Sequence, residues 1–159
     1  GSNRTGRMFT GDSAGNFLYS ALYQAGFCNQ PISRHREDGL AMHDVYITAV
    51  ARCAPPGNKP LPLELENCRN YLEEELRLLT RARVFLALGK IAFDGALKAF
   101  GYQRQPGNAK PAFVHGATYT LNGSTLVASY HVSQQNTQTG RLTMEMFMEV
   151  LATCRRLMD

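Results

Sequence analysis

The chain has 159 residues, of which 44% are hydrophobic and 19% charged, a composition typical of one ordinary globular domain with its own core. No apolar run approaches the ~20 residues that a membrane-spanning helix needs, so we expect no membrane partner. The formal net charge of +4 leans toward an anionic partner, and it permits a nucleic acid without demonstrating one.

The first twelve residues read as a loop that leads directly into an amphipathic segment. Gly6 and Gly11 allow positive φ or a close approach of the backbone to a ligand. The helical spacing of apolar residues predicts a helix over 13–25, ended by Gly26. Asp12 stands where a carboxylate meets a helix N-terminus, so a helix cap is its commonest role and a catalytic role is the alternative.

The middle of the chain predicts two strand–helix pairs after a polar loop at 29–43, whose Arg34, His35 and Arg36 are expected to be solvated. The β-branched and aromatic run 45–48 predicts a buried strand. A loop with four prolines, 52–62, and a helix follow it. The apolar run 84–88 predicts a strand, and Gly89 opens a helix through Phe100. These lengths indicate a parallel sheet with crossover connections. The residues expected to face the core are Leu65, Cys68, Leu72, Leu76 and Leu79, then Ile91, Ala92, Ala96 and Phe100.

The last third begins with a polar loop at 101–116. Asn122-Gly123 predicts a tight turn between strands at 118–121 and 125–130. A polar loop at 129–141 carries His131, and a lone histidine there is more often a surface residue than a catalytic one. A helix follows from Thr143 to about Leu157. Its expected apolar face is Phe147, Val150, Leu151, Cys154 and Leu157.

The four cysteines are Cys28, Cys53, Cys68 and Cys154. No secretion signal is visible, so we expect a reducing compartment and free thiols. Cys154 falls on an apolar helix face, and Cys68 lies on or near another, which favours core packing for both.

Three stretches, residues 1–12, 46–60 and 129–141, are together similar to motifs of the family 5 (type b, iron–sulfur cluster class) uracil-DNA glycosylases. The likeness spans essentially the whole chain. Family 4 enzymes carry Thr-Asn where this chain has Thr48-Ala49, which favours family 5. The resemblance implies an α/β fold with one uracil-DNA glycosylase-like domain over 1–159. Its central, mostly parallel sheet would be flanked by helices and would lack its first strand.

The resemblance implies a DNA base-excision repair glycosylase that hydrolyses the N-glycosidic bond of uracil and other deaminated bases after base flipping. Asp12 and His131 match catalytic residues, Phe9 matches the aromatic that stacks on the flipped base, and Asn58 matches an asparagine near the base pocket. Ala49, in place of an amide, implies loose selectivity. The residues we expect to contact DNA are Arg4, Arg7, Lys59, Ser133, Gln135 and Arg141.

Cys53 and Cys68 match two of the four cysteines that hold a 4Fe–4S cluster in the family. The other two form a Cys-x-x-Cys pair that this sequence does not contain. A first motif of the family also precedes the residues that open this chain. We therefore expect a member that lacks its N-terminal segment, and the activity of this chain is an open question.

The expected partner is double-stranded DNA containing uracil or other deaminated bases, bound by a monomer in the prokaryotic cytoplasm at the nucleoid. Two other classes remain open. An inactive DNA-binding module would tolerate the loss of Asp12. A small metal-binding domain would need Cys53, Cys68 and a histidine to meet.

Overall fold

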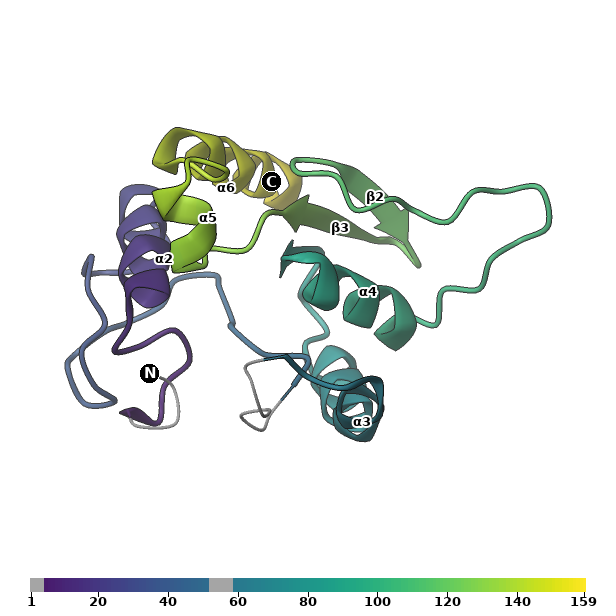
Figure 1. Ribbon diagram of the computed structural model, residues 1–159, viewed down its shortest axis with the longest axis horizontal. Helices are drawn as coiled ribbons and strands as arrows, with labels where there is room; N and C mark the ends of the chain where they lie inside the picture. The colour runs from purple at the N-terminus through teal and green to yellow at the C-terminus, as the bar shows by residue number, and fades with distance from the viewer. Residues whose placement is uncertain (1–4, 52–58) are drawn as a thin grey trace. The chain divides into compact units, whose positions relative to one another are not determined.

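The computed structural model describes residues 5–51 and 59–159 (Figure 1). These residues form two compact units. Unit 1 contains the described residues up to Thr48 together with Tyr130–Arg156, and unit 2 contains Ala49–Ser129 with Leu157–Asp159. Arg4, Cys53 and Asn58, three of the predicted site residues, lie outside the described residues.

Unit 1 is built on α2 (Ser13–Gln24), the short α5 (Gln134–Gln138) and α6 (Met144–Met158). The Phe17 ring of α2 meets the Phe147 ring of α6 with centroids 5.8 Å apart, so the two helices pack directly against each other (Figure 1). Helical spacing aligns the buried residues along each helix. The buried apolar residues of this unit are Leu18, Tyr19, Ala21, Leu22, Phe27, Cys28, Val132, Leu142, Phe147, Val150, Leu151 and Cys154.

The prediction for the last helix is confirmed at Phe147, Val150, Leu151 and Cys154, all of which are buried. It is wrong at Leu157, which keeps 40% of its surface exposed. Spacing marks Leu157 as part of the stripe, but burial also requires a neighbouring element, and contacts become fewer in the last turn of a helix.

Unit 2 holds a three-stranded sheet of β1 (Val84–Leu88), β2 (Thr118–Leu121) and β3 (Ser124–Ser129), in the order β1-β3-β2. β1 pairs with β3 in parallel, and β2 pairs with β3 antiparallel. Asn122 and Gly123 both take positive φ, +51° and +80°, as a tight hairpin turn requires. The hairpin is confirmed. The expected parallel pairing is found between β1 and β3. The described sheet is nevertheless mixed, because β2 runs antiparallel to β3.

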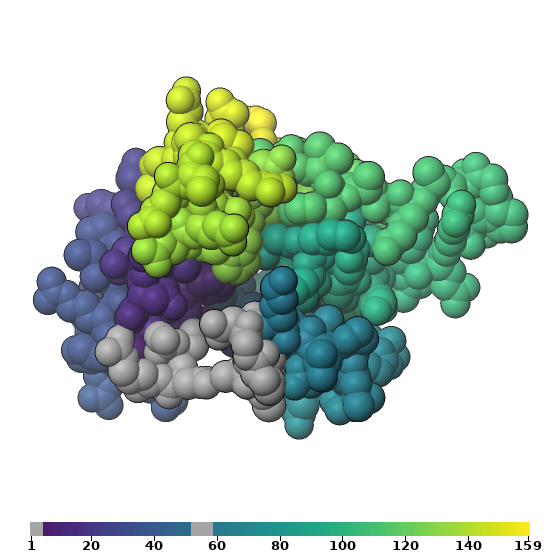
Figure 2. Space-filling model, in the orientation of Figure 1, coloured from purple at the N-terminus to yellow at the C-terminus, as the bar shows by residue number. Residues whose placement is uncertain are grey.

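Two helices, α3 (Pro62–Leu78) and α4 (Lys90–Ala99), complete unit 2. Phe93 and Leu97 of α4 pack with Ala87, Leu126 and Ala128 of the sheet. Residues 101–116 form the predicted loop, and its middle extends away from α4 and the sheet (Figure 2). Tyr102 and Phe113, near the two ends of the loop, pack against this core.

The prediction for the buried face of α4 is wrong at Ile91, which is 46% exposed, while the unpredicted Phe93 is fully buried. At 3.6 residues per turn, Ile91 lies roughly 200° around the helix from Phe93. The two side chains therefore cannot face the same sheet.

The predicted strand at 45–48 is also wrong, since this segment joins no strand in the described part of the chain. Strand propensity expresses how well a side chain fits a pleated, half-buried surface, but a strand exists only through hydrogen bonds to a neighbour. Tyr46 is 60% exposed, which departs from the expected burial. Within the described ranges, no helix has the length and apolar character needed to cross a membrane.

We expect Phe93→Ala to lower the free energy of unfolding by about 3–5 kcal/mol, because it leaves a ring-sized cavity between α4 and the sheet. The exposed Ile91→Ala is the matched control on the same helix, with an expected loss below about 1 kcal/mol. Urea denaturation of both variants measures the difference. Equal losses would contradict the assignment of the buried face.

Candidate active site

Asp12 begins α2. Its Oδ1 accepts a hydrogen bond from the Gly15 N–H at 2.9 Å, and its carbonyl accepts one from the Asn16 N–H at 3.1 Å. The expected cap is thus confirmed. The residue is nevertheless exposed, so capping leaves the carboxylate accessible to a substrate.

Phe9 lies in the loop that precedes this cap and has a φ of +53°, a left-handed conformation that is a genuine outlier for a bulky side chain. Its carbonyl oxygen sits directly against Gly15, where an added Cβ atom would come within 1.6 Å. Position 15 therefore accepts no side chain without moving the Phe9 backbone. The first turn of α2 thus supports the loop through the contact between Gly15 and the Phe9 carbonyl.

His131 follows β3 and is held by the segment after it. Its carbonyl accepts a hydrogen bond from Asn136 Nδ2 at 2.9 Å, and Ser133 Oγ accepts one from the Asn136 N–H at 3.3 Å. Val132 and Leu142, fully buried, anchor the two ends of this segment. Its middle is the helix α5, where the sequence analysis expected only loop. Ser133 as an N-cap was the signal that would have revealed it.

The rings of Phe9 and His131 lie with centroids 6.0 Å apart and planes at 39°. Unit 1 therefore brings together Phe9, Asp12 and His131, although more than 100 residues separate the first two from the third. Burial lowers the pKa of His131 from its ordinary value, and the charge of Asp12 offsets part of that effect. The lowered pKa favours the neutral imidazole, in which one ring nitrogen carries a hydrogen and the other can accept a hydrogen bond.

The predicted DNA contacts are divided between the units. Gln135 and Arg141 are exposed in unit 1, and the Arg141 guanidinium stacks 4.7 Å from the Tyr130 ring centroid. Ser133 is half-buried, with its hydroxyl engaged in the α5 cap. Lys59 is exposed in unit 2. DNA contact by these residues stays a prediction.

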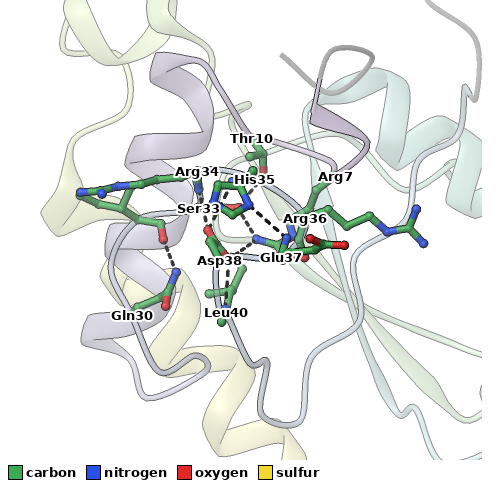
Figure 3. Close-up of polar contacts among 12 residues, drawn as sticks. Arg7, Thr10, Gln30, Ser33, Arg34, His35, Arg36, Glu37, Asp38 and Leu40 are labelled. Carbon is green, nitrogen blue, oxygen red and sulfur yellow. Dashed lines mark hydrogen bonds and ion pairs between the residues drawn. The ribbon is translucent and has the colours of Figure 1, made fainter.

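Arg7 faces the protein. Its Nη1 donates to Asp38 Oδ1 at 2.8 Å and to Ser33 Oγ at 2.9 Å, and its Nη2 donates to the Arg36 carbonyl at 2.8 Å (Figure 3). Only 20% of its side chain is exposed. A phosphate contact by Arg7 would therefore compete with partners it already has.

Three polar residues near the Phe9 loop are buried or nearly so, and no local sequence pattern indicates them: Thr10, Ser33 and Asp38. Burial favours the neutral form of Asp38, but hydrogen bonds from Arg7 and from the Arg34 and Leu40 N–H groups outweigh it and hold the Asp38 pKa well below its usual range. The sequence 29–43 looked like a solvated loop because most of its residues are polar. Arg34, His35 and Arg36 are indeed exposed, and Asp38 is the exception.

The described residues do not assemble an iron–sulfur site. Within residues 5–51 and 59–159, no three histidine, cysteine or acidic side chains come together as a metal site would require. Cys68 is a half-buried free thiol on α3 in unit 2, whereas Cys28 and Cys154 are buried in unit 1. A cluster needs about four thiolates, so these residues alone do not fit one.

Comparison with known proteins shows the family of the chain. The family model described as the Uracil DNA glycosylase superfamily matches residues 1–155. The chain belongs to this superfamily. It is 54% identical over 158 residues to the Type-5 uracil-DNA glycosylase of Thermus thermophilus, a match that covers 99% of this chain and 70% of the relative. The expected family is confirmed.

Two further Type-5 uracil-DNA glycosylases are similar across nearly the whole chain. The Mycobacterium bovis protein is 45% identical over 159 residues, or 99% of this chain and 58% of the relative. The Pyrobaculum aerophilum protein is 44% identical over 151 residues, or 95% of this chain and 64% of the relative. The chain therefore spans about three fifths of the length of these two relatives.

We expect the pKa of His131, followed by NMR of its ring protons, to lie below about 6.5, the ordinary value for histidine. Asp12→Asn removes the charge that favours the imidazolium and should lower this pKa further. Because the folded-state pKa is the lower one, folding stability should fall as pH drops below about 6.5. Asp44→Asn, which removes an exposed carboxylate paired with Arg155, is the control. An unchanged or raised His131 pKa in Asp12→Asn would contradict this prediction.

Proposed function

We propose that the chain hydrolyses the N-glycosidic bond between deoxyribose and uracil, or another deaminated base, in double-stranded DNA. The observation that carries the proposal is the meeting of the Phe9 ring, the Asp12 carboxylate and the His131 imidazole in unit 1. An aromatic face, an anion and a neutral N–H donor are what this hydrolysis requires. Membership of the superfamily supports the same reaction class.

Phe9 is proposed to receive the flipped base. Extracting a base from the duplex costs roughly a few kcal/mol, and stacking on an aromatic ring returns about 1–3 kcal/mol. The half-buried Phe9 ring lies beside His131, so a base stacked on it would be close to a polar group that can interact with its edge. Stacking alone is tolerant of base identity.

Asp12 is proposed to act on the sugar side of the bond. As the bond breaks, positive charge develops on the deoxyribose, and a fixed carboxylate stabilises it; the same carboxylate can also orient the attacking water. Both effects require the negative charge. The Gly15 N–H donates a hydrogen bond to Oδ1 of Asp12 and so fixes the orientation of the carboxylate.

His131 is proposed to act on the base side. The departing uracil carries negative charge on its carbonyl oxygens, and a preorganised N–H donor stabilises such an anion. A neutral imidazole can supply that hydrogen bond without a proton transfer. Its lowered pKa supports this role, because it favours the uncharged ring.

The remaining predictions concern recognition. Ala49 stands where the family 4 motif carries an asparagine, and this difference in sequence supports a broad range of deaminated bases. The exposed Lys59, Gln135 and Arg141 are stronger candidates for DNA contact than Arg7 and Ser133, whose side chains already have partners in the protein. Arg4 remains a proposed contact from the sequence alone. A monomer acting on chromosomal DNA would work in the cytoplasm of a prokaryote, at the nucleoid.

A uracil-containing duplex tests the proposed activity. We expect the chain to release uracil, and we expect Asp12→Asn to slow release under single-turnover conditions by about 100-fold or more. Asparagine caps a helix about as well as aspartate, so this variant removes the charge while keeping the cap.

Asp94→Asn is the matched control, since Asp94 forms exposed ion pairs with Lys90 and Lys110 in unit 2. We expect it to release uracil at the wild-type rate. Equal rates for wild type and Asp12→Asn would remove Asp12 from the reaction. DNA binding without release would favour the inactive binding module.

The iron–sulfur cluster remains a proposal in which Cys53 and Cys68 supply two thiolates and other ligands complete the site. We expect iron in the purified protein, with visible charge-transfer absorbance, and we expect Cys68→Ser to lose most of both. Cys154→Ala removes a buried thiol of α6 and should retain the iron. Iron content unchanged in Cys68→Ser, or absent from the wild type, would reject these ligands.

A further inference from the structure

The loop that carries Phe9 rests on the segment 33–40, which the proposed reaction does not use (Figure 3). Four side chains make this connection. Arg7 and Thr10 reach from the loop, and Ser33 and Asp38 receive them. All lie within unit 1, and Thr10 is fully buried.

Asp38 is the centre of the connection. Oδ1 accepts hydrogen bonds from Arg7 Nη1 at 2.8 Å and from the Leu40 N–H at 3.0 Å. Oδ2 accepts one from the Arg34 N–H at 2.7 Å. The side chain is only 5% exposed, so this carboxylate has left water and depends on these donors. The Asp38 carboxylate therefore binds two backbone N–H groups of its own segment and also the Arg7 guanidinium.

A chain of hydrogen bonds runs from Arg7 to the backbone next to Phe9. Arg7 Nη1 donates to Ser33 Oγ at 2.9 Å, Ser33 Oγ lies 2.6 Å from Thr10 Oγ1, and Thr10 Oγ1 donates to the Met8 carbonyl at 3.2 Å. Because Ser33 already accepts from Arg7 and Thr10 donates to Met8, the arrangement in which Ser33 donates to Thr10 gives each proton an acceptor. The Tyr19 hydroxyl also donates to the Met8 carbonyl, at 3.0 Å.

Phe9 stands between the two residues that are held in this way. Its positive φ costs free energy, and such a conformation persists only where the surroundings determine it. Met8 is held through its carbonyl, Thr10 through its hydroxyl, and the Phe9 carbonyl is pressed against Gly15. The segment 33–40 therefore contributes to the geometry of the ring that lies beside His131.

We propose that Asp38, acting through Arg7 and through the Ser33–Thr10 hydrogen bond, is a positioning residue that holds the Phe9 ring beside His131. This inference rests on the proposed function, in which Phe9 receives the flipped base. It also gives Arg7 a role inside the protein. A misplacement of about 1 Å at a reacting group costs on the order of 100-fold in rate.

The test compares Asp38→Asn, Phe9→Ala and the double variant, each as the full chain, in single-turnover excision from a duplex carrying one uracil. We expect Asp38→Asn to lower the rate at saturating enzyme by about 10–100-fold, and to change the half-saturating concentration by less than about threefold. In the Phe9→Ala background, Asp38→Asn should lower the excision rate by less than about threefold, because the ring that Asp38 is proposed to position is already absent.

A second measurement, by NMR, reports the position of the Phe9 ring and does not depend on catalytic activity. The ring current of Phe9 acts on the His131 ring protons, and Phe9→Ala gives their chemical shifts when the ring is absent. We expect Asp38→Asn to move these shifts toward the Phe9→Ala values. Asp44→Asn, which alters another carboxylate of unit 1, is the matched control and should leave rate and shifts at wild-type values.

Equal rate losses from Asp38→Asn in the two backgrounds would overturn the proposal, as would His131 shifts that stay at wild-type values. If the wild-type chain releases no base, the proposed function fails while the chemical shifts still decide the positioning role. If Asp38→Asn does not fold, Ser33→Ala takes its place, because it removes the hydroxyl that joins Arg7 to Thr10 and leaves the Asp38 carboxylate in place.

Arg7 offers an independent check. If Arg7 contacted phosphate, Arg7→Lys would preserve the contact and Asp38→Asn would release the guanidinium to bind DNA more tightly. We expect Arg7→Lys to reproduce the rate loss of Asp38→Asn, since a lysine ammonium cannot reach Asp38, Ser33 and the Arg36 carbonyl together. Wild-type rates in Arg7→Lys would count against the positioning role.

Discussion

The site depends on the first turn of α2, where Asp12 accepts the Gly15 N–H and the Phe9 carbonyl rests against Gly15. Two functional side chains are fixed by one helix end. The cap orients the carboxylate, and the missing side chain at position 15 lets the Phe9 backbone approach. A helix N-terminus interacts favourably with negative charge, and the proposed reaction, in which positive charge develops on the sugar, would use a carboxylate at that position.

The loop that carries Phe9 is supported by hydrogen bonds between polar side chains. Arg7, Ser33, Thr10 and Asp38 form a connected set in which each buried group has a partner. Buried polar networks are costly when incomplete and rigid when complete. A hydrophobic contact would bury the same surface, but hydrogen bonds also specify direction. That property suits a loop whose aromatic residue is held in a strained backbone conformation.

His131 reaches the same place by a different route. It lies two residues after the end of β3, and Ser133 then caps the N-terminus of α5. The fully buried Val132 and Leu142 anchor this short helix from both sides, while its own residues are not buried. The side chains of the proposed site are thus carried on short segments that are attached to the packed apolar core of unit 1.

The sequence by itself determined the features that local chemistry controls. Helical spacing identified α2 and the buried stripe of α6, Asn122-Gly123 identified the hairpin, and Asp12 was expected as a cap. Ordered motifs identified the superfamily and named Phe9, Asp12 and His131. These signals depend on neighbours within a few residues, or on a long pattern in order, so they can be read without coordinates.

Only the tertiary structure decided the rest, because it depends on which distant groups meet. Residues 45–48 have strand-forming side chains but no strand partner, and Ile91 lies on the wrong side of its helix while Phe93 is buried. Asp38 looked like one polar residue in a solvated loop until Arg7, 31 residues away, was found beside it. A charge that is buried by a partner from elsewhere in the chain carries no local pattern, and for that reason the sequence could not reveal it.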